Sequence, residues 1–145
     1  MATLAHSLSV SSSQSSVSAP VVFLGRLLFS LIFLMSGFTH FSKPIIAYAA
    51  SQGVPAASVL VPLSGIIALF GSLSILFGYR AKLGAWLIVL FLVGVTPLHK
   101  FWGIADPMTQ QLQSAMFMKN LAMLGGALLI TQLGAGPWSL DNRQK

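Results

Sequence analysis

Residues 59–77 read VLVPLSGIIALFGSLSILF, a run without one charged side chain. The run lies inside an uncharged interval that extends from Lys43 to Arg80. Two further uncharged intervals follow, from Lys82 to Lys100 and from Lys119 to Asp141. A charged side chain at the centre of a lipid bilayer costs about 2.5 to 3.5 kcal/mol on insertion scales. The charge pattern therefore predicts a protein that is dissolved in lipid and keeps its charges near the bilayer surfaces.

The composition of the 145 residues supports this interpretation, with 55% hydrophobic and 7% charged residues and a mean hydropathy of +0.84. A soluble domain of this length would lack the polar side chains to cover its surface. The net charge of +6 comes from eight dispersed cations and two acids, which indicates membrane anchoring and not a nucleic-acid-binding patch. The absence of cysteine excludes disulfides, thiolate metal ligands and a thiol nucleophile supplied by this chain.

Four apolar segments have about the twenty residues that a helix needs to cross a hydrocarbon core of about 30 Å. These segments are residues 21–41, 59–77, 83–98 and 117–133. We expect an all-α integral membrane four-helix bundle with antiparallel neighbouring spans, as one membrane domain over residues 21–138. A disordered Ser-rich tail is expected over residues 1–20 and a polar tail over residues 139–145. A plastid-type transit segment is an alternative interpretation of the N-terminal stretch, because it is rich in Ser and poor in acids.

Turn and cap signals divide the rest of the chain. Pro44 as a first-turn residue and the breaker Gly53-Val54-Pro55 predict a short interfacial helix after the first span. The link Gly78-Tyr79-Arg80-Ala81-Lys82 is so short that the second and third spans must be antiparallel neighbours. Asp106-Pro107 predicts a capped helix that begins before the fourth span.

The basic residues predict an orientation. An even number of spans places both termini on one side of the membrane. Five cations lie on that side, namely Arg26, Arg80, Lys82, Arg143 and Lys145, and three lie opposite, namely Lys43, Lys100 and Lys119. By the positive-inside rule this distribution favours cytoplasmic termini.

The same topology brings polar residues from separate segments to the face opposite the termini. They are His40, His99, Lys100, Trp102, Asp106, Lys119 and Asn120. Polar residues at membrane depth are candidates for function, and a pocket lined by donors and open to lipid suits a quinone headgroup. The alternative is solvation at the headgroup level, where Trp, Lys and His side chains are stable.

The two histidines also raise the question of a bound metal. Ligation of a b-type haem needs His40 and His99 to face each other across a cavity, and a metal site would add Asp106. The sequence does not supply that geometry, and we expect neither group. It also has no HExxH motif, no paired carboxylates and no Gly-rich phosphate loop, so it predicts no self-contained hydrolase or nucleotide enzyme.

Several short motifs of this chain occur together in one family. They are Gly25-Arg26, Ser36-Gly37-Phe38, Gly53-Val54-Pro55, Gly78-Tyr79-Arg80, His99-Lys100-Phe101-Trp102, the block from Lys119 to Gly126 and the ending from Gly134 to Asp141. In this order they resemble the DoxX family of small four-helix bacterial membrane proteins, over nearly everything after Val21. The resemblance implies a location in the bacterial inner membrane. It also implies association with quinone-linked redox systems, including quinol oxidase and thiosulfate:quinone oxidoreductase assemblies.

From this resemblance and the topology we expect a quinone-linked subunit of a membrane redox complex. Its candidate headgroup pocket consists of Arg26, His40, His99, Trp102, Lys119 and Asn120. Arg26 and Lys119 would supply positive charge, the two histidines would exchange protons near neutral pH, and Trp102 would cover the ring. No catalytic residue is assigned, and whether the protein is an enzyme stays open. The alternatives are a non-catalytic interaction or assembly subunit, which packs against a larger partner or its own copies, and a small transporter.

Overall fold

The structure, a computed structural model, describes residues 18–143, and within them it contains helices and no strand. The elements are α1 (Ala19–Thr39), α2 (Lys43–Ser51), α3 (Ala57–Phe77), α4 (Ala81–Val95), the 3-10 turn η1 (Thr96–Leu98), α5 (Pro107–Leu133) and α6 (Leu140–Arg143). Four of them, α1, α3, α5 and α4 together with η1, are long and apolar enough to cross a membrane. The predicted all-α four-helix membrane bundle is confirmed.

The observed helices differ from the predicted spans mainly at their ends. Helix α1 begins at Ala19, inside the predicted tail, of which residues 1–17 lie outside the described part of the chain. Helix α5 begins at Pro107, well before the predicted span at residue 117, as the Asp106-Pro107 signal indicated. Hydropathy marks only the part of a helix that suits lipid, whereas α5 begins at its Asp106 cap and α1 begins with a proline in its first turn.

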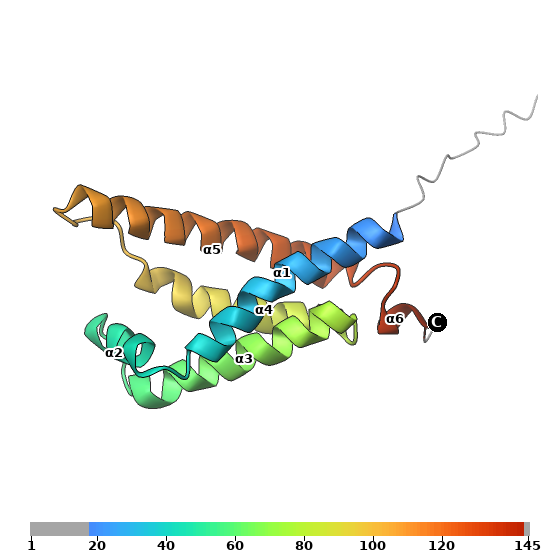
Figure 1. Cartoon of the computed structure of the whole chain (residues 1–145), viewed down its shortest axis with the longest axis horizontal. Coiled ribbons are helices and arrows are strands. Elements are labelled where there is room, and N and C mark those ends of the chain that lie inside the picture. The colour runs from blue at the N-terminus through green and yellow to red at the C-terminus, as the bar shows by residue number, and fades with distance from the viewer. Residues whose placement is uncertain (1–17, 144–145) are drawn as a thin grey trace, which may run out of the picture.

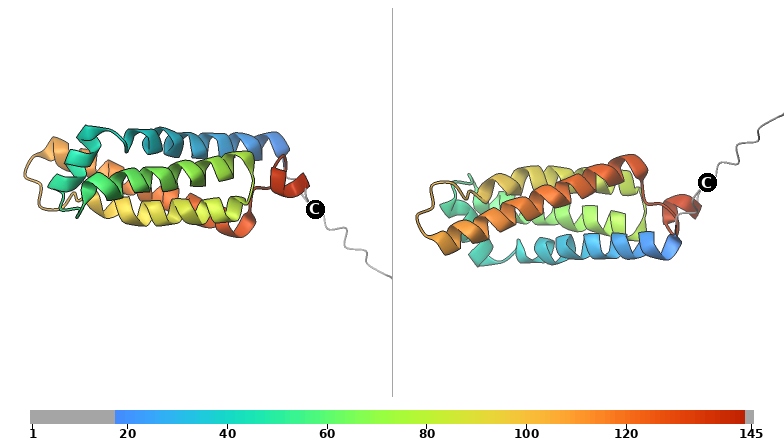
Figure 2. Two further views of the ribbon diagram at one scale, coloured as in Figure 1. Left: turned by 90° about the horizontal axis from the view of Figure 1, so that it is seen from below. Right: turned by 90° about the horizontal axis from the view of Figure 1, so that it is seen from above.

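The long helices pack in chain order, α1 on α3, α3 on α4 and α4 on α5, with their axes side by side (Figures 1 and 2). The start of α1, the α3–α4 turn and α6 lie at one end of the bundle, which we call the arginine end after Arg26. Helix α2 and the link from η1 to α5 lie at the other end, which we call the histidine end after His40 and His99. Helices α1 and α5 touch where Phe29 lies over Gly126 and separate towards the histidine end (Figure 1).

Two glycine pairs bring helix backbones into contact. A Cβ atom at Gly65 of α3 would lie 2.8 Å from the Gly37 carbonyl oxygen of α1, and one at Gly71 would lie 2.9 Å from the Gly84 carbonyl oxygen of α4. Helices in lipid associate through such close approach, because apolar surface gains nothing by leaving lipid for protein. Side chains larger than hydrogen at these positions would separate the helices.

Many large apolar side chains face outward, whereas alanines fill much of the space between the helices. Phe70 and Trp86 are more than half exposed, whereas Ala68, Ala85 and Ala127 are fully buried between the helices. Exposed apolar surface of this extent is rare on soluble monomers and is the normal exterior of a protein surrounded by lipid.

Helix α2 confirms the short helix predicted after the first span. Pro44 lies in its first turn, as expected for a residue that lacks an amide donor. Its buried Ala49 packs with Ala57 and Val61 at the start of α3. Helix α2 is thereby held across the histidine end of the bundle (Figure 1).

The C-terminal segment closes the arginine end. The Asp141 carboxylate accepts hydrogen bonds from the backbone amides of Arg80 at 2.7 Å and Ala81 at 3.0 Å. The Asp141 amide in turn donates to the Gly78 carbonyl at 2.8 Å. Asp141 thus caps the N-terminus of α4 from a distant part of the chain. Residues 139–143 of the predicted polar tail are therefore packed against the α3–α4 turn.

Arg26 joins α1 to the same closure. Its buried guanidinium donates from Nη2 to the Trp138 carbonyl at 2.5 Å. Its Nε and Nη1 atoms and the Ser30 hydroxyl are buried without a hydrogen-bond partner among residues 18–143. Gly78 makes the arrangement possible, because it has a φ of +64° and any Cβ there would collide with Arg26 Nη1 and with Ser139.

Helix α5 begins with the predicted cap. The Asp106 carboxylate accepts hydrogen bonds from the Thr109 hydroxyl at 2.5 Å and from the Thr109 amide at 2.8 Å. Both bonds favour the charged carboxylate, the hydroxyl bond most, and they hold the pKa of Asp106 below its ordinary value.

Candidate functional site

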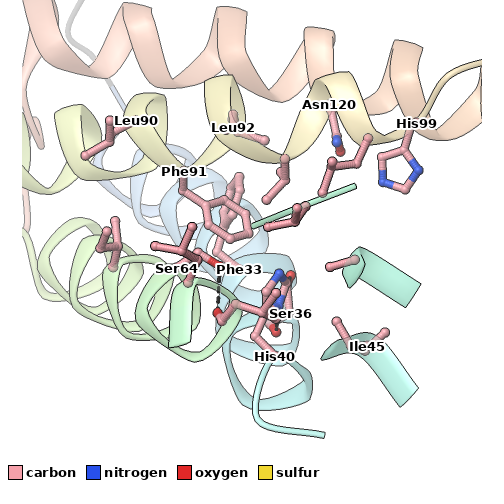
Figure 3. A pocket seen from close by; sticks show the side chains of 18 of the residues that line it. Phe33, Ser36, His40, Ile45, Ser64, Leu90, Phe91, Leu92, His99 and Asn120 are labelled. Carbon is pink, nitrogen blue, oxygen red and sulfur yellow. Dashed lines mark hydrogen bonds between the residues drawn. The ribbon is translucent and has the colours of Figure 1, made fainter. Parts of the chain in front are cut away.

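A cavity of about 380 Å³ lies at the histidine end, enclosed by all four long helices and by α2 (Figure 3). Most of its wall is apolar, with Phe33 and Phe91 on one side and Ile67 and Met123 on others. The polar residues that line it are Ser36, His40, Tyr48, Ser64, His99, Lys119 and Asn120. An apolar chamber with a few convergent polar groups is the usual form of a small-molecule site, and its volume lies within the usual range.

His40 enters the cavity from the end of α1. Its Nδ1 atom lies 2.6 Å from the Ser36 carbonyl oxygen, and because a carbonyl only accepts, Nδ1 must donate. In the neutral ring Nε2 is then the nitrogen with a free lone pair. The ring packs edge-on against Phe91 at 5.3 Å between centroids. Gly65 leaves space for it, since a Cβ there would lie 2.8 Å from the His40 Cβ.

His99 has a similar arrangement on the other side of the cavity. Its Nδ1 atom lies 2.9 Å from the Gln113 Oε1 atom, so that Nδ1 again donates and Nε2 again has the lone pair in the neutral ring. The Gln113 Nε2 atom donates to the Tyr48 hydroxyl at 3.2 Å. A hydrogen-bonded chain of His99, Gln113 and Tyr48 therefore runs from the end of η1 through α5 to α2.

Asn120 is the most deeply buried polar residue of the site. It is only 4% exposed and points from α5 towards the cavity (Figure 3). Its side chain makes no hydrogen bond within residues 18–143, and its amide atoms are not among the fully buried unpaired atoms, so they are accessible from the cavity. Its neighbour Lys119 lines the cavity from a more exposed position, with Nζ 3.4 Å from the Met116 sulfur.

Four of the six residues predicted for a headgroup pocket line this cavity, namely His40, His99, Lys119 and Asn120. Arg26 does not, because it precedes His40 by fourteen positions, about 21 Å at 1.5 Å per residue. Trp102 does not either; it is 58% exposed and stacks edge-on with Phe101 and Phe117 outside the cavity. Among the described residues, no three His, Asp or Glu side chains gather closely enough to hold a metal ion.

Two polar residues of the site, Gln113 and Tyr48, were missed by the sequence analysis. Gln113 precedes Asn120 by seven residues, which places both on one face of α5. That spacing was a usable signal for Gln113. Tyr48 had no comparable signal, because its role depends on how α2 folds back over the bundle.

Comparison with known proteins identifies the family. A family model described as DoxX matches residues 21–103, more than half of the chain. The chain belongs to the DoxX family. The DoxX match covers both histidines of the cavity and ends before α5, which contributes Gln113, Lys119 and Asn120.

Individual relatives agree with the DoxX assignment. The Inner membrane protein YqjF of Escherichia coli is 33% identical over 126 residues, which cover 83% of this chain and 88% of YqjF. The membrane protein Rv3486 of Mycobacterium tuberculosis is 28% identical, with 86% and 81% coverage of the two chains. The ER-derived vesicles protein ERV29 of Saccharomyces cerevisiae is 29% identical over 55% of this chain and 26% of its own length. No solved structure matches this DoxX-family chain.

Proposed function

We propose that this DoxX-family membrane protein is a quinone-linked subunit of a redox complex in the bacterial inner membrane. The cavity at the histidine end would bind the quinone headgroup. The observation that carries the proposal is the amide of Asn120, which makes no hydrogen bond within residues 18–143 and lines an apolar chamber together with two imidazoles. A ligand with oxygen atoms would give hydrogen-bond partners to the Asn120 amide and to the Nε2 atoms of the two histidines, for which no other described side chain supplies one.

The shape of the bundle supports entry from lipid. Helices α1 and α5 separate towards the histidine end (Figure 1), where both contribute residues to the wall of the cavity. Ile32 and Leu60 line the cavity and are also exposed on the outer surface, so its rim is apolar. A lipid-soluble molecule would therefore reach the polar groups without crossing water.

A bound quinone would supply two-electron, two-proton redox chemistry. The chain's own residues would hold the ring against Phe33 and Phe91, orient its oxygen atoms with Asn120, and exchange protons at Nε2 of His40 and His99. The sequence has no cysteine, so any thiol-based electron carrier belongs to a partner protein. With the arginine end in the cytoplasm, as the positive-inside rule favours, the cavity would open near the opposite membrane surface.

An equilibrium binding measurement tests the proposal. Detergent-solubilised protein is titrated with a short-chain ubiquinone in its oxidised and reduced forms. Asn120→Leu should weaken binding at least about tenfold, because the variant loses a buried hydrogen-bonding group at the ligand. Asn142→Leu, an exposed asparagine at the arginine end, is the matched control and should bind like the wild type. Equal affinities for the two variants, or no binding by the wild type, would contradict the proposal.

A non-catalytic assembly subunit is the second candidate. The exposed side of α5 favours it, where Ala122 is exposed and a Cβ at Gly125 would meet no other atom within 4 Å. Small residues on a lipid-facing side allow another helix to approach closely. Cross-linking at Ala122, followed by identification of a stable complex that contains no quinone, would favour this function over the first.

A further inference from the structure

We infer that Gln113 is a positioning residue that fixes which groups of the cavity donate hydrogen bonds and which accept them. This arrangement makes the cavity prefer the reduced, hydroxyl-bearing form of the headgroup. The inference rests on the proposed function and specifies which redox state the site holds. Gln113 does not line the cavity; it is half-buried behind His99 and Tyr48 and acts through them.

The first step concerns the proton on His99. The Gln113 Oε1 atom can only accept, so its contact with His99 at 2.9 Å requires the ring proton to be on Nδ1. The neutral ring is thereby held as the tautomer whose Nε2 accepts hydrogen bonds. The backbone carbonyl of Ser36 has the same effect on His40, at 2.6 Å. Both rings line the cavity, and in both the nitrogen available to a ligand is an acceptor.

The second step concerns the proton on Tyr48. The Gln113 Nε2 atom donates to the Tyr48 oxygen at 3.2 Å, which leaves the phenolic proton of Tyr48 free to be donated elsewhere. Tyr48 lines the cavity, and no other described hydrogen bond involves its hydroxyl. The side-chain amide of Gln113 therefore leaves His99 with an acceptor for a ligand and Tyr48 with a donor.

These donors and acceptors distinguish the two redox forms of a quinone. A hydroxyl of the reduced form can donate to an imidazole Nε2 and accept from Tyr48 or Asn120 at the same time. A carbonyl of the oxidised form can only accept, and it leaves both imidazole lone pairs without a donor. Because unpaired buried acceptors weaken binding, the reduced form should bind about tenfold more tightly.

The test has one measurement that needs no ligand. Protein labelled with 15N-histidine is studied by NMR at about pH 8, above the ordinary titration range of histidine, and the His99 signals are assigned with His99→Asn. In the wild type, His99 Nδ1 should carry the proton. In Gln113→Leu the two tautomers should mix. Gln111→Leu, an exposed glutamine of the same helix, is the matched control and should leave the tautomer unchanged.

The second measurement is the ratio of the affinities for reduced and oxidised short-chain ubiquinone. Gln113→Leu should lower this ratio at least about threefold, since His40 still accepts while His99 no longer does so uniformly. Tyr48→Phe should keep the His99 tautomer and weaken both forms. Gln113→Met, which is flexible and of similar size, replaces Gln113→Leu if thermal unfolding shows that the latter is not folded.

The outcomes separate this inference from the proposed function. If the wild type binds neither form, the proposed function fails and the redox preference fails with it. If the wild type binds but Gln113→Leu keeps the same affinity ratio, only the role of Gln113 is overturned. A His99 proton found on Nε2 in the wild type would also overturn it.

Discussion

At the arginine end the Asp141 carboxylate accepts hydrogen bonds from two backbone amides, whereas at the histidine end the side-chain amide of Asn120 has no partner among residues 18–143. Arg26 also has unpaired nitrogens, but they are sealed behind Gly78 and Ser139, whereas Asn120 lines a cavity. Polar groups at one end therefore hold the chain together, and those at the other are available to a ligand.

The difference separates two reasons for which a membrane protein contains polar residues. The DoxX-like motifs Gly78-Tyr79-Arg80 and the ending at Asp141 meet at the arginine end, where their contacts are with each other. The polar residues of the cavity come from four helices and from the residues that follow α1 and η1, and the hydrogen bonds that join them are those of His40 and His99. Substitutions at the first end should lower stability, and those at the second should change binding and not stability.

The largest loss of stability is expected from Gly78→Val. The variant forces a β-branched residue into a φ of +64° and places its side chain where Arg26 and Ser139 lie. Left-handed strain and overpacking together should cost about 3 kcal/mol. Chemical unfolding in detergent measures the loss, with Gly125→Val as the control, because a Cβ at Gly125 meets open space. Equal stability of the two variants would show that the arginine end is not a rigid closure.

Asp141→Ala should have the next largest effect. The variant removes the acceptor of two amides at the start of α4, and losing a helix cap costs about 0.5 to 2 kcal/mol. Hydrogen exchange at the Arg80 and Ala81 amides should accelerate. Asp141→Asn keeps one acceptor oxygen and should show an intermediate effect. If exchange at both amides stays as slow as in the wild type, the contact seen here does not protect α4.

Such long-range contacts mark the limit of what the sequence predicts. The spans, the helix α2 and the Asp106 cap follow from local patterns of charge, proline and capping residues. Arg26 and Trp138 are 112 residues apart, and Tyr48 and Gln113 are 65 apart. Topology can assign residues to an end of the bundle, but it does not determine which side chains meet there.

The six predicted site residues show the same limit. His40, His99, Lys119 and Asn120 line one cavity, because each lies near the same end of the bundle. Trp102 lies at that end too, but it stacks outside the cavity, which hydropathy could not reveal. Arg26 was included for its charge and its place in the Gly25-Arg26 motif, although an even number of spans puts it at the other end of the bundle.

A smaller effect on stability is expected from Asn120→Leu, although this variant should lose ligand binding. Its side chain has no hydrogen bond in the described part of the chain to lose, and an apolar replacement of similar size suits the mostly apolar wall of the cavity. The free energy of unfolding should therefore be unchanged within about 0.5 kcal/mol or rise slightly. The same detergent unfolding series measures it. A loss as large as that of Asp141→Ala would mean that Asn120 supports the fold, and the contrast between the two ends would disappear.

The smallest effect is expected at the start of α5, where Asp106 caps a turn that is exposed to water. Hydrogen bonds from Thr109 hold the pKa of Asp106 below its ordinary value. The cap therefore stabilises α5 fully at pH values above the ordinary pKa, and this stabilisation is lost as the pH falls through the lowered pKa. Protection of the Thr109 amide is measured by hydrogen exchange relative to an unfolded peptide. As the pH is lowered, protection should persist through the range in which an ordinary aspartate takes up its proton, and it should fall only at lower pH. Asp106→Asn should keep the protection at every pH, because its amide oxygen accepts the same bond. Protection that already falls in the ordinary carboxyl range would show that Thr109 does not favour the charged form. The exposed cap at Asp106 would then be weaker than the cap that Asp141 provides for α4 at the arginine end.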